Sequence, residues 1–112
     1  MFRGPSIPTV TVGDIADDAY ILDVREADEW AAGHAPDAVH VPMMQIPARI
    51  DEIPEDRDVV VVCRVGGRSA QVVAFLQQNG RERTINLDGG MQMWEAAGRP
   101  MTSEDGGAPR VL

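Results

Sequence analysis

The chain has one cysteine, Cys63, and the residues around it are typical of a nucleophilic site. Four valines precede it, and the segment "RVGGRS" follows it over residues 64–69. Because the thiolate is the reactive form of cysteine, cationic neighbours such as Arg64 and Arg68 favour its chemistry. A lone cysteine also serves as a small buried hydrophobic residue. The adjacent glycines and arginines favour the reactive role, with the pKa of the Cys63 thiol below its ordinary value.

The two glycines after Cys63 predict a turn that brings main-chain amides to the sulfur. We expect Gly66 and Gly67 to allow positive φ and to let the backbone approach a bound group closely. Successive N–H groups in such a turn form an anion-binding nest. A helix predicted from residue 68 adds the unpaired donors of its first turn. The sequence therefore predicts a backbone cradle around an ionised sulfur.

Short apolar runs alternate with helix-like stretches along the chain, and this alternation positions the turn. The patterns predict strands over residues 9–12, 19–24, 38–42, 57–63 and 83–87, and helices over 13–18, 26–33, 43–53, 68–79 and 89–98. Such alternation is typical of an α/β fold, a parallel sheet with helices on both faces. The valine run suits a strand buried on both faces. Because sites in such folds lie at the carboxyl ends of strands, Cys63 stands where chemistry is expected.

The length and composition predict one domain. At 112 residues the chain is long enough for a single core. We expect that domain over residues 1–102 and a flexible C-terminal tail over 103–112. The net charge of −8 argues against nucleic acid as a partner, since nucleic-acid binding needs basic patches. With no apolar run near the roughly 18–20 residues of a membrane span and no signal-peptide pattern, we expect a cytoplasmic protein without a membrane partner.

Three segments together resemble the rhodanese-like family. The loop "CRVGGRS" resembles its active-site loop, C-x-x-G-x-R-[ST]. Residues 21–42, "ILDVREADEWAAGHAPDAVHVP", resemble its first signature, and residues 86–100, "NLDGGMQMWEAAGRP", resemble its last. Asp37 and Ala35 depart from the glycine and isoleucine of the first signature. The resemblance implies a three-layer rhodanese-like fold, with a sheet of about five parallel strands and helices on both faces.

The same resemblance implies a thiosulfate sulfurtransferase-type enzyme. In that reading Cys63 attacks the outer sulfur of a small anionic donor such as thiosulfate, becomes a persulfide, and passes the sulfur to a thiol or to cyanide. No metal or organic cofactor is implied. The substrate-binding residues implied by the loop are Arg64, Val65, Gly66, Gly67, Arg68 and Ser69. From its charge alone, Arg64 also predicts a preference for an anionic donor.

Asp23 and Arg25 lie at the carboxyl end of the second predicted strand, as Cys63 lies at the carboxyl end of the fourth. We expect Arg25 to form an ion pair and to support the loop rather than to react. His34 is expected to anchor its turn through hydrogen bonds. One cysteine and two scattered histidines do not make a zinc pattern.

Two other functions remain open at the level of sequence. A non-turnover persulfide carrier or protein-binding module would use the same loop to receive sulfur from a protein donor and to pass it to a protein acceptor, and the acidic surface would suit a basic partner. A cysteine phosphatase uses the longer loop C-x5-R around an oxyanion. Here Cys63 and Arg68 enclose four residues, and the smaller loop suits a single sulfur atom better.

Overall fold

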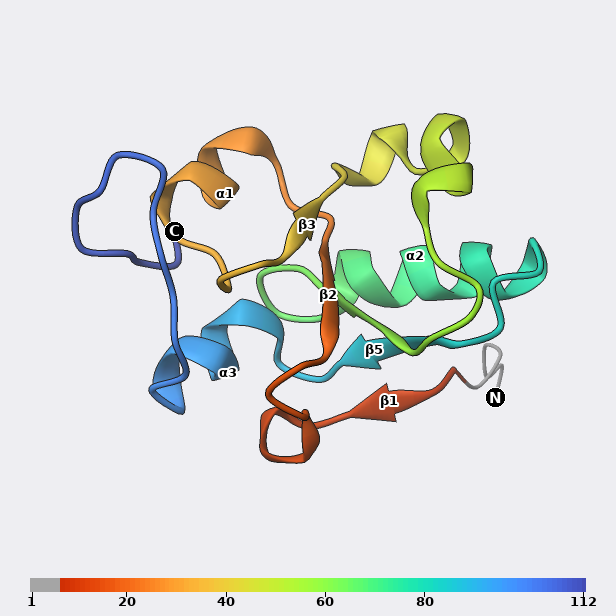
Figure 1. Cartoon of the computed structure of the whole chain (residues 1–112), viewed down its shortest axis with the longest axis horizontal. Helices are drawn as coiled ribbons and strands as arrows, with labels where there is room; N and C mark the ends of the chain where they lie inside the picture. The colour runs from red at the N-terminus through yellow and green to blue at the C-terminus, as the bar shows by residue number, and fades with distance from the viewer. Residues whose placement is uncertain (1–6) are drawn as a thin grey trace, which may run out of the picture.

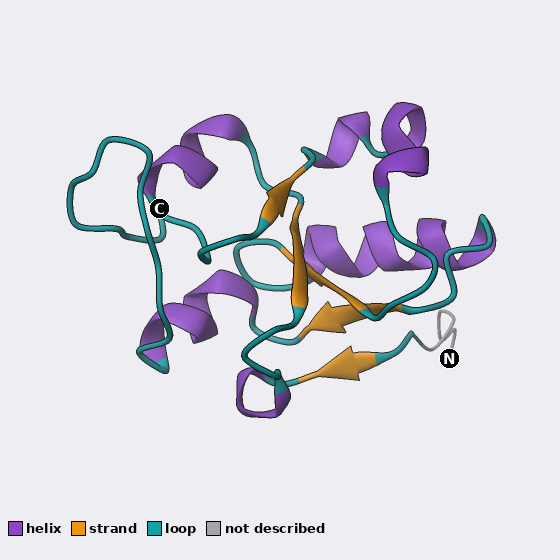
Figure 2. Ribbon diagram, in the orientation of Figure 1, coloured by secondary structure: helices purple, strands orange, loops and turns teal. Residues whose placement is uncertain are grey.

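A parallel sheet between two layers of helices forms the molecule, and the computed structural model describes residues 7–112 of it (Figures 1 and 2). The strands are β1 (Thr9–Val10), β2 (Tyr20–Asp23), β3 (Val39–His40), β4 (Val59–Val62) and β5 (Thr84–Leu87). They pair in the order β1-β5-β4-β2-β3, and every pair is parallel. The predicted α/β fold class is therefore confirmed, with the strand before Cys63 at the centre of the sheet.

The valine run of β4 is buried on both of its faces because successive side chains of a strand point to opposite sides. Val59, Val61 and Cys63 share a core with residues of helix α2 (Gly67–Gln78). Val60 and Val62 share the other core with residues of helix α3 (Gly90–Ala96). The alternation thus places Cys63 on the α2 side of the sheet, directly before the turn into that helix.

The predicted helices over residues 13–18 and 43–53 are wrong in type and extent. The first is a 3-10 turn, η1 (Val12–Asp14), which begins so early that β1 ends at Val10. The second is a pair of 3-10 segments, η2 (Met43–Gln45) and η3 (Pro47–Glu52). Pro47 has no N–H to continue the hydrogen-bond ladder from η2, and Arg49 leaves helical geometry at φ −118°.

No helix described over residues 7–112 is long and apolar enough to cross a membrane.

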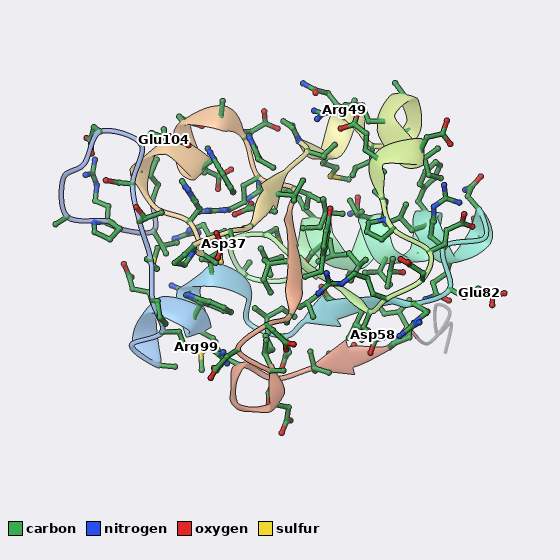
Figure 3. All side chains as sticks on the ribbon, in the orientation of Figure 1. Asp37, Arg49, Asp58, Glu82, Arg99 and Glu104 are labelled. Carbon is green, nitrogen blue, oxygen red and sulfur yellow. The ribbon has the colours of Figure 1, made fainter. Side chains whose placement is uncertain are left out.

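Helix α1 (Ala27–Ala32) leads into a turn that explains one departure from the family pattern. Asp37, labelled in Figure 3, has φ of 63°. Among residues 7–112 it is the one residue other than glycine with a positive φ. The family signature has glycine at this position, and aspartate is among the few other residues that tolerate the left-handed region. The turn geometry is therefore kept although the glycine is not.

Residues 103–112 run alongside α1 (Figure 1). Glu104 N donates to Ala31 O at 3.0 Å and Arg110 N donates to Ala32 O at 2.9 Å, both in α1. Val111 N also donates to the Glu95 carboxylate of α3 at 3.0 Å. The segment thus lies against two helices. The domain boundary at residue 102 and the flexibility of the tail stay predictions.

Candidate active site

The loop after β4 turns sharply into α2, and one glycine makes that turn. Gly66 has φ of 112° and ψ of −8° and caps α2 in the left-handed region, which glycine enters without a steric penalty. Gly67 is already the first residue of the helix and its φ is not positive. The expectation that both glycines supply positive φ is therefore wrong for Gly67, because the helix begins one residue earlier than the sequence pattern suggests.

The sulfur of Cys63 faces the amides of this loop. Gly66 N donates to Sγ at 3.1 Å, and Ser69 Oγ lies 3.3 Å from it. Cys63 is 1% exposed, so the loop encloses the sulfur almost completely. Burial by itself raises the pKa of the Cys63 thiol, but hydrogen bonds from the Ser69 hydroxyl and from the amides of Ser69, Gly66 and Val65 outweigh it, and the pKa lies below its ordinary value. The geometry thus favours the thiolate.

The two loop arginines donate to partners other than the sulfur. Arg68 donates to both carboxylate oxygens of Glu29, at 2.8 and 2.9 Å. Arg64 donates through Nε to the carbonyl oxygen of Leu112 at 2.8 Å. The contacts of Sγ come from amides and a hydroxyl, and the guanidinium groups lie outside that ring. The substrate-binding role predicted for Arg64 and Arg68 stays a prediction.

Glu29 belongs to this site, although reasoning from the sequence assigned it only to a helix. It lies in the first turn of α1, and its pair with Arg68 ties that helix to the first turn of α2. The signal was available, since the first family signature has glutamate at this position of the chain. The pairing of Glu29 with Arg68 could not be predicted, because nothing in the sequence spacing shows that α1 faces the loop.

The Glu29–Arg68 pair predicts how stability responds to acid. Hydrogen bonding to Arg68 lowers the pKa of Glu29 from 4.5 to about 2. Because the folded-state pKa is below the unfolded one, the stabilisation is complete above about pH 4.5 and is lost as pH falls toward about 2. We expect Glu29→Gln to lose less of its free energy of unfolding than the wild type over this range, measured by urea denaturation at several pH values. Glu82→Gln, at an exposed position, should follow the wild-type curve, and equal slopes for wild type and Glu29→Gln would contradict the assignment.

Asp23 and Arg25 form the predicted ion pair at the carboxyl end of β2. Both are 0% exposed. Arg25 Nε donates to Asp23 Oδ1 at 2.9 Å, and Arg25 Nη2 donates to Asp23 Oδ2 at 2.8 Å and to the Gly33 carbonyl at 2.7 Å. The pair therefore fixes the chain on both sides of α1. Its support of the catalytic loop stays a prediction.

The start of α3 holds the loop from the other side. Met91 N donates to Cys63 O at 2.8 Å, and Gln92 N donates to Arg64 O at 3.0 Å. This contact needs Gly90, because a Cβ atom there would lie 2.4 Å from Cys63 O and because the residue has φ of 54°. The Gly-Gly pair of the last signature thus allows α3 to approach the backbone of the loop closely.

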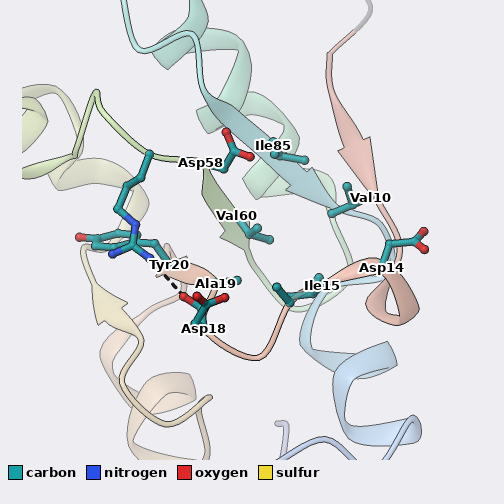
Figure 4. Close-up of a pocket in the computed structure, with 11 residues that line it drawn as sticks. Val10, Asp14, Ile15, Asp18, Ala19, Tyr20, Asp58, Val60 and Ile85 are labelled. Carbon is teal, nitrogen blue, oxygen red and sulfur yellow. Dashed lines mark hydrogen bonds between the residues drawn. The ribbon is translucent and has the colours of Figure 1, made fainter.

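A separate pocket lies away from Cys63, toward the opposite ends of the central strands (Figure 4). Its volume is about 320 Å³, and its lining includes Tyr20, Asp58 and Val60. Tyr20 begins β2 and Asp58 precedes β4, so the pocket reaches the amino ends of these two strands, whereas Cys63 follows the carboxyl end of β4. None of the predicted site residues lines it. Within residues 7–112, no group of three or more histidine, cysteine or acidic side chains is arranged to hold a metal ion.

Comparisons with known proteins identify relatives of this chain. The family model of the Rhodanese-like domain matches residues 11–97. A sulfurtransferase of Allochromatium vinosum is 46% identical over 90 residues, which cover 80% of this chain and 84% of that protein. The thiosulfate sulfurtransferase GlpE of Pseudomonas savastanoi is 35% identical over 78 residues, 70% of this chain and 74% of that one.

A crystal structure shows the same fold. The rhodanese-related protein of Thermoplasma volcanium superposes with a TM-score of 0.79 at 28% identity, over 85% of this chain and 97% of that one. The relatives support sulfur transfer as the general activity. The chain belongs to the rhodanese-like domain family.

Proposed function

We propose that this protein is a thiosulfate sulfurtransferase-type enzyme that carries sulfane sulfur on Cys63 as a persulfide. The observation that carries the proposal is the ring of donors around Sγ, in which the Gly66 amide lies 3.1 Å from the sulfur. Amide donors favour an anionic sulfur, and no basic side chain is needed to remove a proton from a thiol that is already ionised. The named relative GlpE supports thiosulfate as the donor.

The loading step forms one sulfur–sulfur bond and breaks another. The Cys63 thiolate attacks the outer sulfur of thiosulfate, and sulfite leaves with the electron pair of the broken bond. The electron pair of the Cys63 thiolate forms the new bond, the outer sulfur keeps the negative charge that it has in thiosulfate, and no proton is transferred.

Discharge regenerates the starting enzyme. The carbon of cyanide, or the sulfur of an acceptor thiolate, attacks the outer sulfur of the persulfide. The electron pair of the broken bond returns to Cys63 as a thiolate. Amides of Val65, Gly66 and Ser69 then stabilise the charge again, since hydrogen bonds to the charged form favour it. Arg64 is exposed, and its positive charge attracts the anionic donor.

The experiment is to incubate the protein with thiosulfate and to measure its intact mass, then to add cyanide and follow thiocyanate. We expect a gain of one sulfur atom, its loss with cyanide, and neither change in Cys63→Ser. In steady state, Arg64→Ala should raise the KM for thiosulfate. A wild-type protein that gains no sulfur from thiosulfate would overturn the proposal.

The rate of thiocyanate release and an assay with an aryl phosphate separate the alternatives. Thiocyanate release that is rapid and repeated over many turnovers identifies a catalyst. Release that is slow with cyanide and fast with a protein thiol identifies a carrier with protein partners. Hydrolysis of a generic aryl phosphate would instead identify a phosphatase.

The cytoplasmic location of the protein stays a prediction.

A further inference from the structure

We propose that Asn86 is a positioning residue that competes with Cys63 for the single hydroxyl hydrogen of Ser69. Asn86 lies on β5 directly beside Val61 of β4, and Cys63 follows two residues later on the same face of the sheet. Its carboxamide oxygen is 2.6 Å from Ser69 Oγ, which is in turn 3.3 Å from Cys63 Sγ. These three side chains form one hydrogen-bonded line from the strand to the sulfur.

The line is shielded from water. Cys63 is 1% exposed, Ser69 0% and Asn86 7%. Buried polar groups take their hydrogen bonds from one another because little solvent is at hand to replace a missing partner. Where the Ser69 hydrogen points is therefore decided within this line.

The distances establish which end of the Asn86 carboxamide faces Ser69. A separation of 2.6 Å is ordinary for an O–H···O bond and short for an N–H···O bond. In this orientation Asn86 Nδ2 points at the Gly66 carbonyl, 3.5 Å away, as a donor facing an acceptor. The opposite orientation would place two oxygen atoms against each other there. The carboxamide oxygen therefore faces Ser69, and the hydrogen between them is that of the hydroxyl.

When Cys63 is a thiol, the hydrogens of its S–H and of the Ser69 hydroxyl each have an acceptor. The Ser69 hydroxyl has one hydrogen, which it donates to Asn86 Oδ1, and its oxygen accepts the S–H of Cys63. Each group in the line then has a partner. Asn86 thus stabilises the protonated form of the sulfur.

When Cys63 is a thiolate, the one hydrogen of Ser69 cannot serve both the sulfur and the Asn86 oxygen. A thiolate has no hydrogen to donate and competes for the hydrogen of Ser69. If the hydroxyl turns to the sulfur, two oxygen acceptors are left 2.6 Å apart without a hydrogen between them. If it stays on Asn86, the thiolate loses its side-chain donor and keeps only the amides. Asn86 therefore opposes ionisation of Cys63 through Ser69.

This competition gives the hydroxyl a partner at every stage of transfer. The inference rests on the proposed function in one respect, namely that the charge leaves Sγ when the persulfide forms. At that step Sγ becomes a weak acceptor, and the Ser69 hydrogen returns to Asn86. On discharge the hydrogen turns back to the regenerated thiolate. Asn86 acts through Ser69 and does not touch the reacting atoms.

Two variants of Asn86 should change thiol reactivity in opposite directions. Asn86→Leu keeps the shape of the side chain and removes the acceptor, which frees Ser69 for the thiolate. We expect alkylation by iodoacetamide at mildly acidic pH to become about threefold faster, because the larger thiolate fraction is partly offset by lower nucleophilicity. Asn86→Asp adds a negative charge and holds the hydroxyl hydrogen more firmly. We expect alkylation to become about tenfold slower, since a like charge and a lost donor both disfavour the thiolate.

The matched controls separate this role from a structural one. Thr84→Val removes another buried polar group from the same face of β5, away from the sulfur, and should leave the alkylation profile unchanged. In a Ser69→Ala background, Asn86→Leu should no longer speed alkylation, since the shared hydrogen is gone. Three results would each overturn the proposal. The two Asn86 variants could change alkylation in the same direction, both could leave it unchanged, or Asn86→Leu could still speed it in the Ser69→Ala background. If the wild type takes no sulfur from thiosulfate while this pattern holds, the proposed function fails and the role of Asn86 stands.

Discussion

Replacing Gly90 by alanine is expected to lower kcat/KM for sulfur transfer by about 100-fold, because the new methyl group displaces the loop that carries Cys63. The added Cβ would lie 2.4 Å from Cys63 O and 2.7 Å from Arg64 O. To relieve these contacts, α3 must move and give up the bonds from Met91 N and Gln92 N to those two carbonyls. The peptides whose amides surround the sulfur would then rotate. Overpacking and the strained φ together should also lower the free energy of unfolding by about 2–4 kcal/mol.

Gly98→Ala is the matched control for this prediction. Gly98 has φ of 70°, close to the 54° of Gly90, but an added Cβ would meet no atom within 4 Å. It should therefore show the cost of backbone strain without loss of activity. Initial rates of thiocyanate formation and urea denaturation measure the two effects. Similar activity in the two variants would mean that the approach of α3 does not position the loop.

Replacing Asp23 by asparagine is expected to lower the free energy of unfolding by about 3–5 kcal/mol, because it leaves the buried charge of Arg25 without its counter-charge. Both side chains are fully buried, and asparagine would turn an N–H donor toward the guanidinium. Natural domains have a total stability of about 5–15 kcal/mol, so the loss is a large fraction of it. Urea denaturation followed by tryptophan fluorescence measures the change.

Glu52→Gln is the control for charge removal at an exposed pair. Glu52 pairs with Arg49 at 2.8 Å, and their side chains are 52% and 34% exposed. Solvent screens such surface pairs, and they contribute little to stability, so this variant should be nearly as stable as the wild type. Equal losses for Asp23→Asn and Glu52→Gln would show that burial does not set the strength of the Asp23–Arg25 pair.

The strand, turn and helix around Cys63 could be predicted because each has a local signal. The valine run has the composition of a strand buried on both faces, and the glycines mark the turn. These patterns predict the order of the elements and place Cys63 at the carboxyl end of the central strand. The local pattern predicts positive φ at both Gly66 and Gly67, whereas Gly66 is the one of the two that adopts it. Either glycine satisfies the same local pattern, and only the packing of α2 decides where the helix begins.

The partners of the polar side chains could not be predicted from the sequence, since they depend on how the elements pack. Glu29 is 39 residues from Arg68, and Asn86 is 17 residues from Ser69. Each pair forms because two elements meet at the loop. The same holds for Arg64, whose contact with Leu112 depends on where the tail lies. The sequence therefore predicts Cys63 as the nucleophile, but it does not show which residues hold its loop.

The most direct test of the account is the ionisation of Cys63 in the folded protein. Because the chain has one cysteine, the difference in ultraviolet thiolate absorbance between wild type and Cys63→Ser reports that residue alone. The hydrogen bonds from Ser69, Gly66 and Val65 predict a midpoint below the ordinary thiol pKa of 9.0 and below the midpoint of the same chain unfolded in urea. A folded midpoint at or above that of the unfolded chain would contradict the claim that the loop holds an ionised sulfur.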